Sequence, residues 1–174
     1  MIIRSAEPND AAAILEIHNA AVTGSTAIWT DRLETVADRE AYLTDHAASG
    51  HAVLVAEADG VVVGYASIGT WRQKNGYRLT VDDSVYVRNS HHGTGIGRAL
   101  LAELIERARV GGFHVMIADI EAGNAASIRL HEQFGFEVCG TIREVGTKYG
   151  RWLDLTVMRL ELSAGSPPAL ADLA

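Results

Sequence analysis

The segment from residue 84 to residue 108, SVYVRNSHHGTGIGRALLAELIERA, places a strand, a glycine loop and an amphipathic helix directly after one another. β-Branched and aromatic residues at 84–87 favour a strand. The helix that follows carries an apolar stripe formed by Ile96, Leu100, Leu101, Leu104, Ile105 and Ala108. A strand that feeds such a helix needs a sheet for the stripe to cover, so the segment predicts a mixed α/β fold.

Hydrophobic patterns in the rest of the chain predict further strands and helices. We expect strands at 1–6, 51–58, 61–71, 79–87, 113–121, 136–146 and 151–162, and helices at 7–22, 34–49, 96–108 and 124–134. Asp59 and Gly60 predict a two-residue hairpin turn, and the apolar run at 113–121 predicts a strand covered on both faces. The order predicts one domain at 1–162, followed by a disordered tail at 163–174.

Composition excludes several classes of function. The net charge is −7, with 15 Lys and Arg against 22 Asp and Glu, and no basic run offers a surface for nucleic acid or for an anionic membrane. Cys139 is the single cysteine, and the first residues lack the pattern of a signal peptide, so we expect a cytoplasmic protein. No spacing of His and Cys suits a metal site, and we expect no metal.

The glycine loop narrows the choice of ligand. A dinucleotide motif would need a third glycine where Arg98 or Leu100 stands, and a phosphate-binding P-loop would need a lysine that is absent here. Glycines at a helix start allow several N–H groups to converge where the helix dipole is positive, which suits a pyrophosphate. The alternative is a loop that merely joins the strand to the helix.

The residues VYVRNSHHGTGIGRALL resemble the acetyl-coenzyme A motif of the GNAT superfamily of N-acetyltransferases, and NAASIRLHEQFGF resembles its second signature. The resemblance implies the GNAT fold, a central mixed, mostly antiparallel twisted sheet of about seven strands flanked by about four helices. It implies acetyl-CoA as the co-substrate. The cofactor-binding residues it implies are Val85, Tyr86, Val87, His92, Gly93, Thr94, Gly95, Ile96, Gly97, Arg98, Asn124 and Ser127.

Segments from Ile2 to Leu162 also resemble the phosphinothricin and methionine sulfoximine acetyltransferase subfamily, among them TAIWTDR and VGTKYGRWLDLTVMRLEL. This similarity implies an amino-acid-like acceptor and a homodimer. A guanidinium can hold a carboxylate through two hydrogen bonds, which makes Arg72 and Arg78 candidate ligands, and the resemblance favours Arg72. The substrate-binding residues we expect are Trp29, Arg72, Gln73, Lys74, Arg78, Asp83 and Ser84, while Tyr149 and Trp152 are candidates for the dimer interface or the pocket.

Acetyl transfer to an amine needs a base and a group that stabilises the leaving thiolate. Strand alternation puts Asp82, Ser84 and Tyr86 on one face and Asp83, Val85 and Val87 on the other. The resemblance places the general base at Asp82 and a catalytic imidazole at His131, either as the acid or as a helper in deprotonation. The chain departs from the subfamily by carrying Asp82 for Glu and Asp83 for His. The alternatives are two solvated acids and a structural histidine.

Three functions remain open at this stage. The first is an N-acetyltransferase for a small amino acid or analogue, such as phosphinothricin or methionine sulfoximine, which would confer resistance to such compounds. The second is a protein N-terminal acetyltransferase with a groove for a peptide. The third is a GNAT module that binds acetyl-CoA without turnover.

Overall fold

The computed structural model describes residues 1–165, so most of the tail predicted at 163–174 lies outside the described residues. The elements follow the predicted order. They are β1 (Ile2–Ser5), α1 (Ala11–Gly24), α2 (Val36–Ala48), β2 (Val53–Ala58), β3 (Val61–Thr70), β4 (Thr80–Val87), α3 (Ile96–Val110), β5 (Val115–Glu121), α4 (Ala125–Glu132), β6 (Glu137–Lys148) and β7 (Arg151–Glu161), with 3₁₀ turns at Pro8–Asp10, Asn75–Tyr77 and Asn89–His91.

Seven strands form one sheet in the order β1-β2-β3-β4-β5-β7-β6. Every neighbouring pair is antiparallel except β4 and β5, which run parallel. The predicted mixed, mostly antiparallel sheet of seven strands is therefore confirmed. The α3 helix connects the two parallel strands, as a parallel pair requires a crossover.

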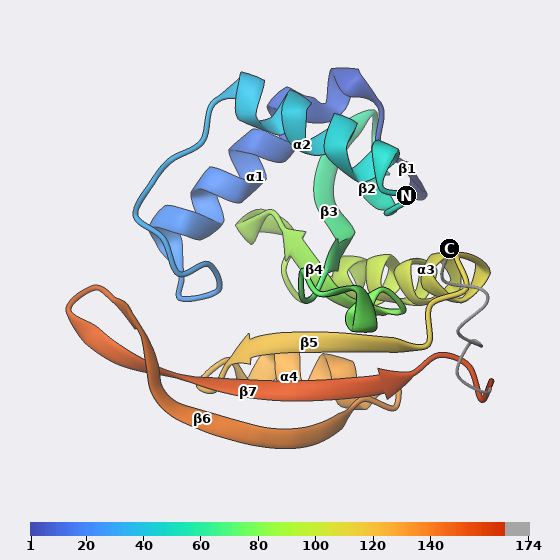
Figure 1. Cartoon of the computed structure of the whole chain (residues 1–174). Helices are drawn as coiled ribbons and strands as arrows, with labels where there is room; N and C mark the ends of the chain where they lie inside the picture. Colours follow the sequence, from blue (N-terminus) through green and yellow to red (C-terminus); the bar gives the residue numbers. More distant parts are fainter. Residues whose placement is uncertain (166–174) are drawn as a thin grey trace.

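The central parallel pair is short. Register between β4 and β5 runs from Thr80 opposite Val115 to Asp82 opposite Ile117, and there the pairing ends. Beyond this point β4 continues along β3 while β5 continues along β7, so the two strands diverge (Figure 1). The sheet is thereby opened in its middle, at the carboxyl half of β4.

Helices cover both faces of the sheet and enclose two apolar clusters. The larger cluster lies under α3 and includes the whole predicted stripe of that helix, each side chain at most 4% exposed. The smaller lies under α1 and contains Ile14, Ile17 and Tyr65. On β2, Leu54 belongs to the first cluster and Val55 to the second, as alternation along a strand requires.

One expectation about β5 needs correction. The strand was expected to be covered on both faces, and Met116, Ala118 and Ile120 are buried under α3 and α4. On the opposite face Ile117 is also buried, and only Asp119 is exposed. The physical reason is that β5 has left β4 by this residue, so the side chain points to the opening between the strands. Within residues 1–165 no helix has the length and apolarity to span a membrane.

The β6–β7 hairpin projects beyond β5 and reaches the carboxyl end of α1 (Figure 1). The Lys148 side chain is 3% exposed, and its Nζ donates to the carbonyl oxygens of Val22 at 2.6 Å, Ser25 at 2.8 Å and Ile28 at 2.6 Å. An ammonium group has three donors, and all three are used here. One lysine therefore fastens the end of α1 and the start of the following loop to the hairpin.

Replacing Lys148 with Met should remove the ammonium donor from three carbonyl groups, of which those of Val22 and Ser25 keep the Tyr149 hydroxyl within 3.1 and 3.3 Å. We expect the free energy of unfolding to fall by about 2–3 kcal/mol, since hydrogen bonds to charged groups contribute about 1.5–3 kcal/mol each and water can restore some. Urea unfolding measures the change. The exposed Lys74→Met is the matched control and should stay within about 0.5 kcal/mol of the parent; equal stability of both variants would refute the assignment.

Candidate active site

The glycine loop turns directly into α3. Gly93 and Gly95 have φ angles of 75° and 86°, in the left-handed region where a side chain is strained, and a Cβ at either position would meet nothing within 4 Å. His92 folds back so that its Nε2 lies 2.9 Å from the carbonyl oxygen of Val87. Ile96 is buried in the core, so only its backbone faces the loop. The loop thus presents backbone groups and a positive helix end to an anion.

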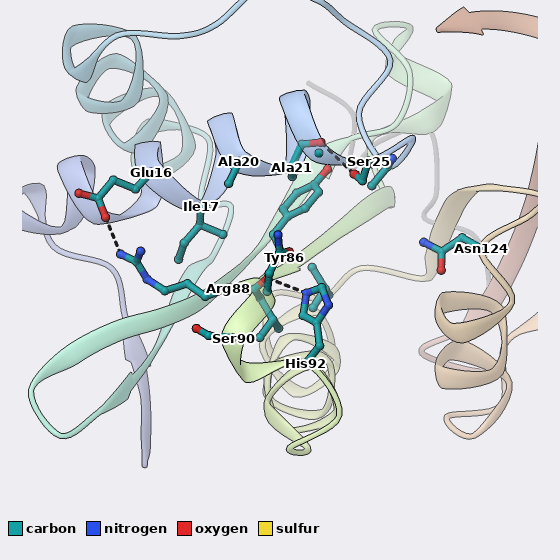
Figure 2. Close-up of a pocket in the computed structure, with 15 residues that line it drawn as sticks. Glu16, Ile17, Ala20, Ala21, Ser25, Tyr86, Arg88, Ser90, His92 and Asn124 are labelled. Atoms are coloured by element: carbon teal, nitrogen blue, oxygen red, sulfur yellow. Dashed lines mark hydrogen bonds and ion pairs between the residues drawn. The ribbon is translucent and has the colours of Figure 1, made fainter. Parts of the chain in front are cut away.

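Two hollows adjoin this loop on either side of β4. One, of about 290 Å³, lies between the loop and α4 and is lined by Val85, Val87, Gly95, Asn124 and Ser127 among others. The other, of about 390 Å³, lies between α1 and the end of β4 (Figure 2). The ion pair of Arg88 with Glu16 crosses from β4 to α1 at 2.7 Å at one end of it. An extended ligand can follow these hollows from the α3 end toward the sheet.

The hollows continue into a smaller space where β4 and β5 separate, which we call the β4–β5 cleft. It measures about 90 Å³ and is lined by Ala27, Asp83, Ser84, Val85, Tyr86, Ala118, Asp119, Ile120, Asn124, Ser127 and His131. Because β4 has no strand on this side after Asp82, the backbone edge of its carboxyl half faces the cleft. The cleft therefore brings together four of the twelve predicted cofactor residues, Val85, Tyr86, Asn124 and Ser127, with Asp83, Ser84 and His131.

The α4 helix starts at Asn124, whose side-chain Oδ1 accepts from the Ser127 backbone N–H at 3.1 Å, as predicted for its N-cap. About two turns after Asn124, His131 is 3% exposed and packs edge-on against Phe136, with ring centroids 4.9 Å apart. The side of α4 that carries Asn124, Ser127 and His131 is therefore turned to the β4–β5 cleft and not to solvent.

Asp82 lies on the face of β4 that is turned toward α1 and α2, opposite Gly69 of β3 and in contact with it. Burial is the largest cause that raises the pKa of its carboxyl group, and the nearby charges of Asp83 and Asp119 raise it further. Backbone hydrogen bonds oppose the shift, and the pKa settles at about 6. A carboxylate with this pKa can accept a proton from an ammonium near neutral pH.

Asp83 lies on the opposite face of β4, toward α4. Its Oδ2 is 3.0 Å from His131 Nε2, and both side chains are at most 4% exposed. Burial alone would lower the pKa of His131, but the hydrogen bond and charge of Asp83 and the Ser127 carbonyl outweigh it, so the pKa is raised. Adjacent residues of one strand thus place two carboxyl groups on two sides of the sheet.

The predicted carboxylate ligands gather elsewhere. Arg72, Gln73, Lys74 and Arg78 line a hollow of about 360 Å³ where β3 ends and β4 begins, apart from Asp83 and Ser84. The Arg72 guanidinium lies over the Trp71 ring, 4.7 Å from its centroid. Partial burial raises the pKa of the Asp119 carboxyl group. The positive charge of Arg72 is close enough to Asp119 to oppose this rise. Arg72 therefore connects this hollow with the opening of the sheet.

Trp29 occupies the loop after α1. Its Nε1 donates to the Thr26 carbonyl at 2.8 Å, and its ring lies against Gly146 of β6. The loop carries Ala27, which lines the β4–β5 cleft. The structure thus sets Trp29 between the loop and the hairpin that holds it.

The sequence analysis missed a polar group beside Asp82, composed of Tyr42, Arg39 and Glu34. Arg39 is 5% exposed, forms an ion pair with Glu34 and lies 4.2 Å from the centroid of the Tyr42 ring. Burial is the largest cause that raises the pKa of Tyr42, and the negative charge of Asp82 raises this pKa further. No sequence signal identifies this group, because Arg39 and Tyr42 lie on a helix of ordinary composition and Glu34 lies in the loop before it. Asp119 could have been identified from the sequence, because it is a charged residue inside the apolar run at 113–121.

The arrangement suits a ligand with an anionic part at the α3 N-terminus and a reactive end in the β4–β5 cleft. The glycine positions leave room for such a ligand, because the space above them is open. Among residues 1–165 no three His, Cys, Asp or Glu side chains gather in a way that could hold a metal ion. The expectation of no metal stays a prediction.

Comparison with known proteins gives a consistent result. The sequence pattern of the Acetyltransferase (GNAT) family matches residues 13–136. The L-methionine sulfoximine/L-methionine sulfone acetyltransferase of Salmonella typhimurium is 51% identical over 168 residues, which are 97% of this chain and 98% of that protein. The phosphinothricin N-acetyltransferase of Alcaligenes faecalis is 36% identical over 94% of this chain and 83% of its own.

Solved structures agree with these relatives. An acetyltransferase from Salmonella typhimurium, solved with its cofactor acetyl-CoA, has a TM-score of 0.96 and 50% identity, with 98% of each chain covered. A structure described as a ribosomal-protein-alanine N-acetyltransferase from Brucella melitensis has a TM-score of 0.92 and 51% identity, over 92% of this chain and 99% of that one.

The raised pKa of Asp82 has a consequence for stability. The folded protein holds this proton up to about pH 6, whereas the unfolded chain releases it near the ordinary value of 3.8. Between these values the folded state binds more protons, so stability falls as the pH rises from about 4 to about 6. Asp82→Asn should remove this part of the pH dependence and be relatively more stable at pH 7. Urea unfolding of both proteins from pH 4 to pH 7 measures it; parallel curves would contradict the burial of a charge at this position.

Proposed function

The chain belongs to the acetyltransferase (GNAT) family and is an acetyl-CoA-dependent N-acetyltransferase, and from this premise we propose that it acetylates the α-amine of a small amino acid or amino-acid analogue. Methionine sulfoximine is the first candidate acceptor and phosphinothricin the second. The observation that carries the proposal is the 51% identity, over nearly the full length of both chains, to a protein named for methionine sulfoximine and methionine sulfone.

We propose that acetyl-CoA is held by the α3 loop and the β4–β5 cleft. Backbone N–H groups of residues 93–97 and the helix dipole suit its pyrophosphate. Ser127 and the backbone edge of β4 line the path toward the sheet. When bound, acetyl-CoA supplies an activated acetyl group. Backbone N–H groups of β4 that face the cleft would stabilise the negative charge that develops on the carbonyl oxygen.

Asp82 is the proposed general base. It faces the α1 and α2 side of the sheet, and the pKa of its carboxyl group is raised to about 6. Such a group accepts a proton from the acceptor ammonium, directly or through a water, and leaves a neutral nucleophile. Arg72, the guanidinium nearest the opening, is the proposed ligand of the acceptor carboxylate, with Gln73, Lys74 and Arg78 beside it.

A second function has support of its own. The Brucella melitensis structure, 51% identical, is described as a ribosomal-protein-alanine N-acetyltransferase, so an acceptor that is the N-terminus of a protein stays a candidate. The third alternative, a module that binds acetyl-CoA without turnover, is set aside because the family and its relatives are enzymes. A cytoplasmic location and a role in resistance stay predictions.

An acceptor panel tests the proposed function. Release of coenzyme A thiol is measured with methionine sulfoximine, methionine sulfone, phosphinothricin and a short peptide that begins with alanine. We expect turnover with methionine sulfoximine, methionine sulfone and phosphinothricin. For Asp82→Asn we expect kcat to fall by about 10²-fold or more, because the general base is removed. Asp59→Asn, in the exposed β2–β3 turn, is the matched control. Turnover with the peptide alone would favour the second function, and an unchanged Asp82→Asn would refute the base.

We also propose a homodimer formed through the β6–β7 edge. Exposed apolar side chains gather there, with Val138, Ile142, Val145, Tyr149 and Trp152 each 50–66% exposed. Because β6 is an edge strand, its backbone is also open to pairing. Light scattering should give a dimer for the parent and a monomer for Ile142→Glu and Trp152→Glu. Val110→Glu, an exposed apolar site at the end of α3, should stay dimeric; a monomeric parent would end this proposal.

A further inference from the structure

Glu121, the last residue of β5, contacts two loops with the two oxygens of its carboxylate. Oε1 accepts a hydrogen bond from the Gly123 backbone N–H at 2.9 Å, in the turn between β5 and α4. Oε2 accepts one from the Thr26 hydroxyl at 3.1 Å, in the loop after α1. Thr26 and Glu121 lie 95 positions apart in the chain. One carboxylate therefore joins two distant segments, and each segment carries a residue that lines the β4–β5 cleft.

The turn after β5 is fixed by both the backbone and the side chain of Glu121. The Glu121 carbonyl oxygen accepts a hydrogen bond from the Asn124 N–H at 2.9 Å. A Cβ on Gly123 would meet Glu121 Oε1 at 3.0 Å and Oε2 at 3.1 Å, so a glycine leaves room for the carboxylate. Asn124, which this turn places, caps α4 and lines the cleft and the hollows on both sides of β4 (Figure 2). Glu121 thus sets the position of a residue on the proposed path of acetyl-CoA.

The loop after α1 forms another wall of the cleft. Ala27 lines both the cleft and the hollow beside α1. Trp29 Nε1 donates to the Thr26 carbonyl oxygen, so the position of Thr26 also sets that of Trp29. Lys148 fastens this loop to the β6–β7 hairpin, whereas Glu121 attaches it to the end of β5.

Both donors to the Glu121 carboxylate are neutral groups, a backbone amide and a hydroxyl. Hydrogen bonds to an ionised acceptor are stronger than those between neutral groups. A glutamine can preserve the arrangement, because its carbonyl oxygen accepts from Gly123 and its amide donates to the Thr26 oxygen, which can also accept. An alanine preserves neither contact. These two substitutions therefore distinguish the loss of the contacts from the loss of the charge.

We propose that Glu121 is a positioning residue that holds the loop after α1 and the β5–α4 turn together at the edge of the β4–β5 cleft. The inference rests on the proposed function, in which acetyl-CoA passes Asn124, and on the expectation that the acceptor contacts Trp29. Glu121 itself touches neither reactant and acts through these two residues.

The two contacts of Glu121 serve different ligands. Acetyl transfer needs the amine and the thioester carbon to be held within reach and aligned, and a small displacement of either lowers the rate. The Gly123 contact fixes the turn that places Asn124, on the side of the cofactor. The Thr26 contact fixes the loop that carries Trp29, on the side of the acceptor. Loss of one contact should therefore weaken the binding of one ligand more than that of the other.

Steady-state kinetics test this division. Thr26→Val removes the hydroxyl donor and keeps a β-branched side chain, so it should raise the acceptor KM by about fivefold or more and change the acetyl-CoA KM by less than about twofold. Thr26→Ser keeps the donor and is the matched control, with both values close to those of the parent. Equal increases of the two KM values in Thr26→Val would overturn the proposal.

Variants of Glu121 supply the second test. Glu121→Ala should raise both KM values by about fivefold or more, and Glu121→Gln should stay within about twofold of the parent in both. The double variant Glu121→Ala/Thr26→Val should raise the acceptor KM no further than Glu121→Ala alone, because the contact is already absent. Parent-like KM values in Glu121→Ala, or a Glu121→Gln that fails like the alanine variant, would refute the role of these contacts.

Calorimetry with acetyl-CoA and no acceptor keeps the outcome independent of turnover. Glu121→Ala should weaken acetyl-CoA binding by about fivefold, whereas Thr26→Val and Glu40→Gln, a change on the exposed side of α2, should match the parent. Circular dichroism checks that each variant is folded at the assay temperature. If the parent turns over no acceptor of the panel, the proposed function fails, while unchanged acetyl-CoA binding in Glu121→Ala would overturn the positioning role on the cofactor side.

Discussion

The site depends on the point where β4 and β5 stop pairing. A parallel pair in the middle of a sheet is normally buried on both faces, with its backbone groups satisfied by the neighbouring strand. Here the pairing ends at Asp82, and each strand keeps only its outer neighbour. The open backbone edge, the cleft and the access to both faces of β4 all follow from this separation, and the α3 loop stands at its entrance.

Strand alternation then places the carboxyl groups of Asp82 and Asp83 on opposite faces of the sheet. Consecutive residues of a strand point to opposite faces, so Asp82 and Asp83 reach different environments although they are covalent neighbours. Asp82 is buried near like charges and gains affinity for a proton, while Asp83 faces an imidazole on α4. Two identical side chains thus reach different surroundings, one buried near like charges and the other hydrogen-bonded to an imidazole.

Much of this was predictable from sequence because local patterns carried it. The strand and helix order, the α3 stripe and the Asn124 cap depend on periodicity and on capping chemistry, and the structure confirms them. The division of β4 into two faces was also predictable. The contact of Asp83 with His131 was not, because it joins elements far apart in the chain. The position of Asp82 beside Tyr42 was not predictable for the same reason. The expected substrate cations were found together, but in a hollow of their own beside the β3–β4 connection.

The lysine that fastens the α1 loop has a consequence for the order of assembly. Its bond to Val22 joins residues 126 positions apart in a chain of 174, so it closes most of the chain into one loop. Contacts of such long sequence separation form late, because their entropy of closure must be met before they stabilise anything. A nascent chain that has not yet extruded the β6–β7 hairpin lacks both this anchor and the strand that supports β5. The loop after α1 is therefore fastened only once the β6–β7 hairpin has been synthesised, later than the α3 loop.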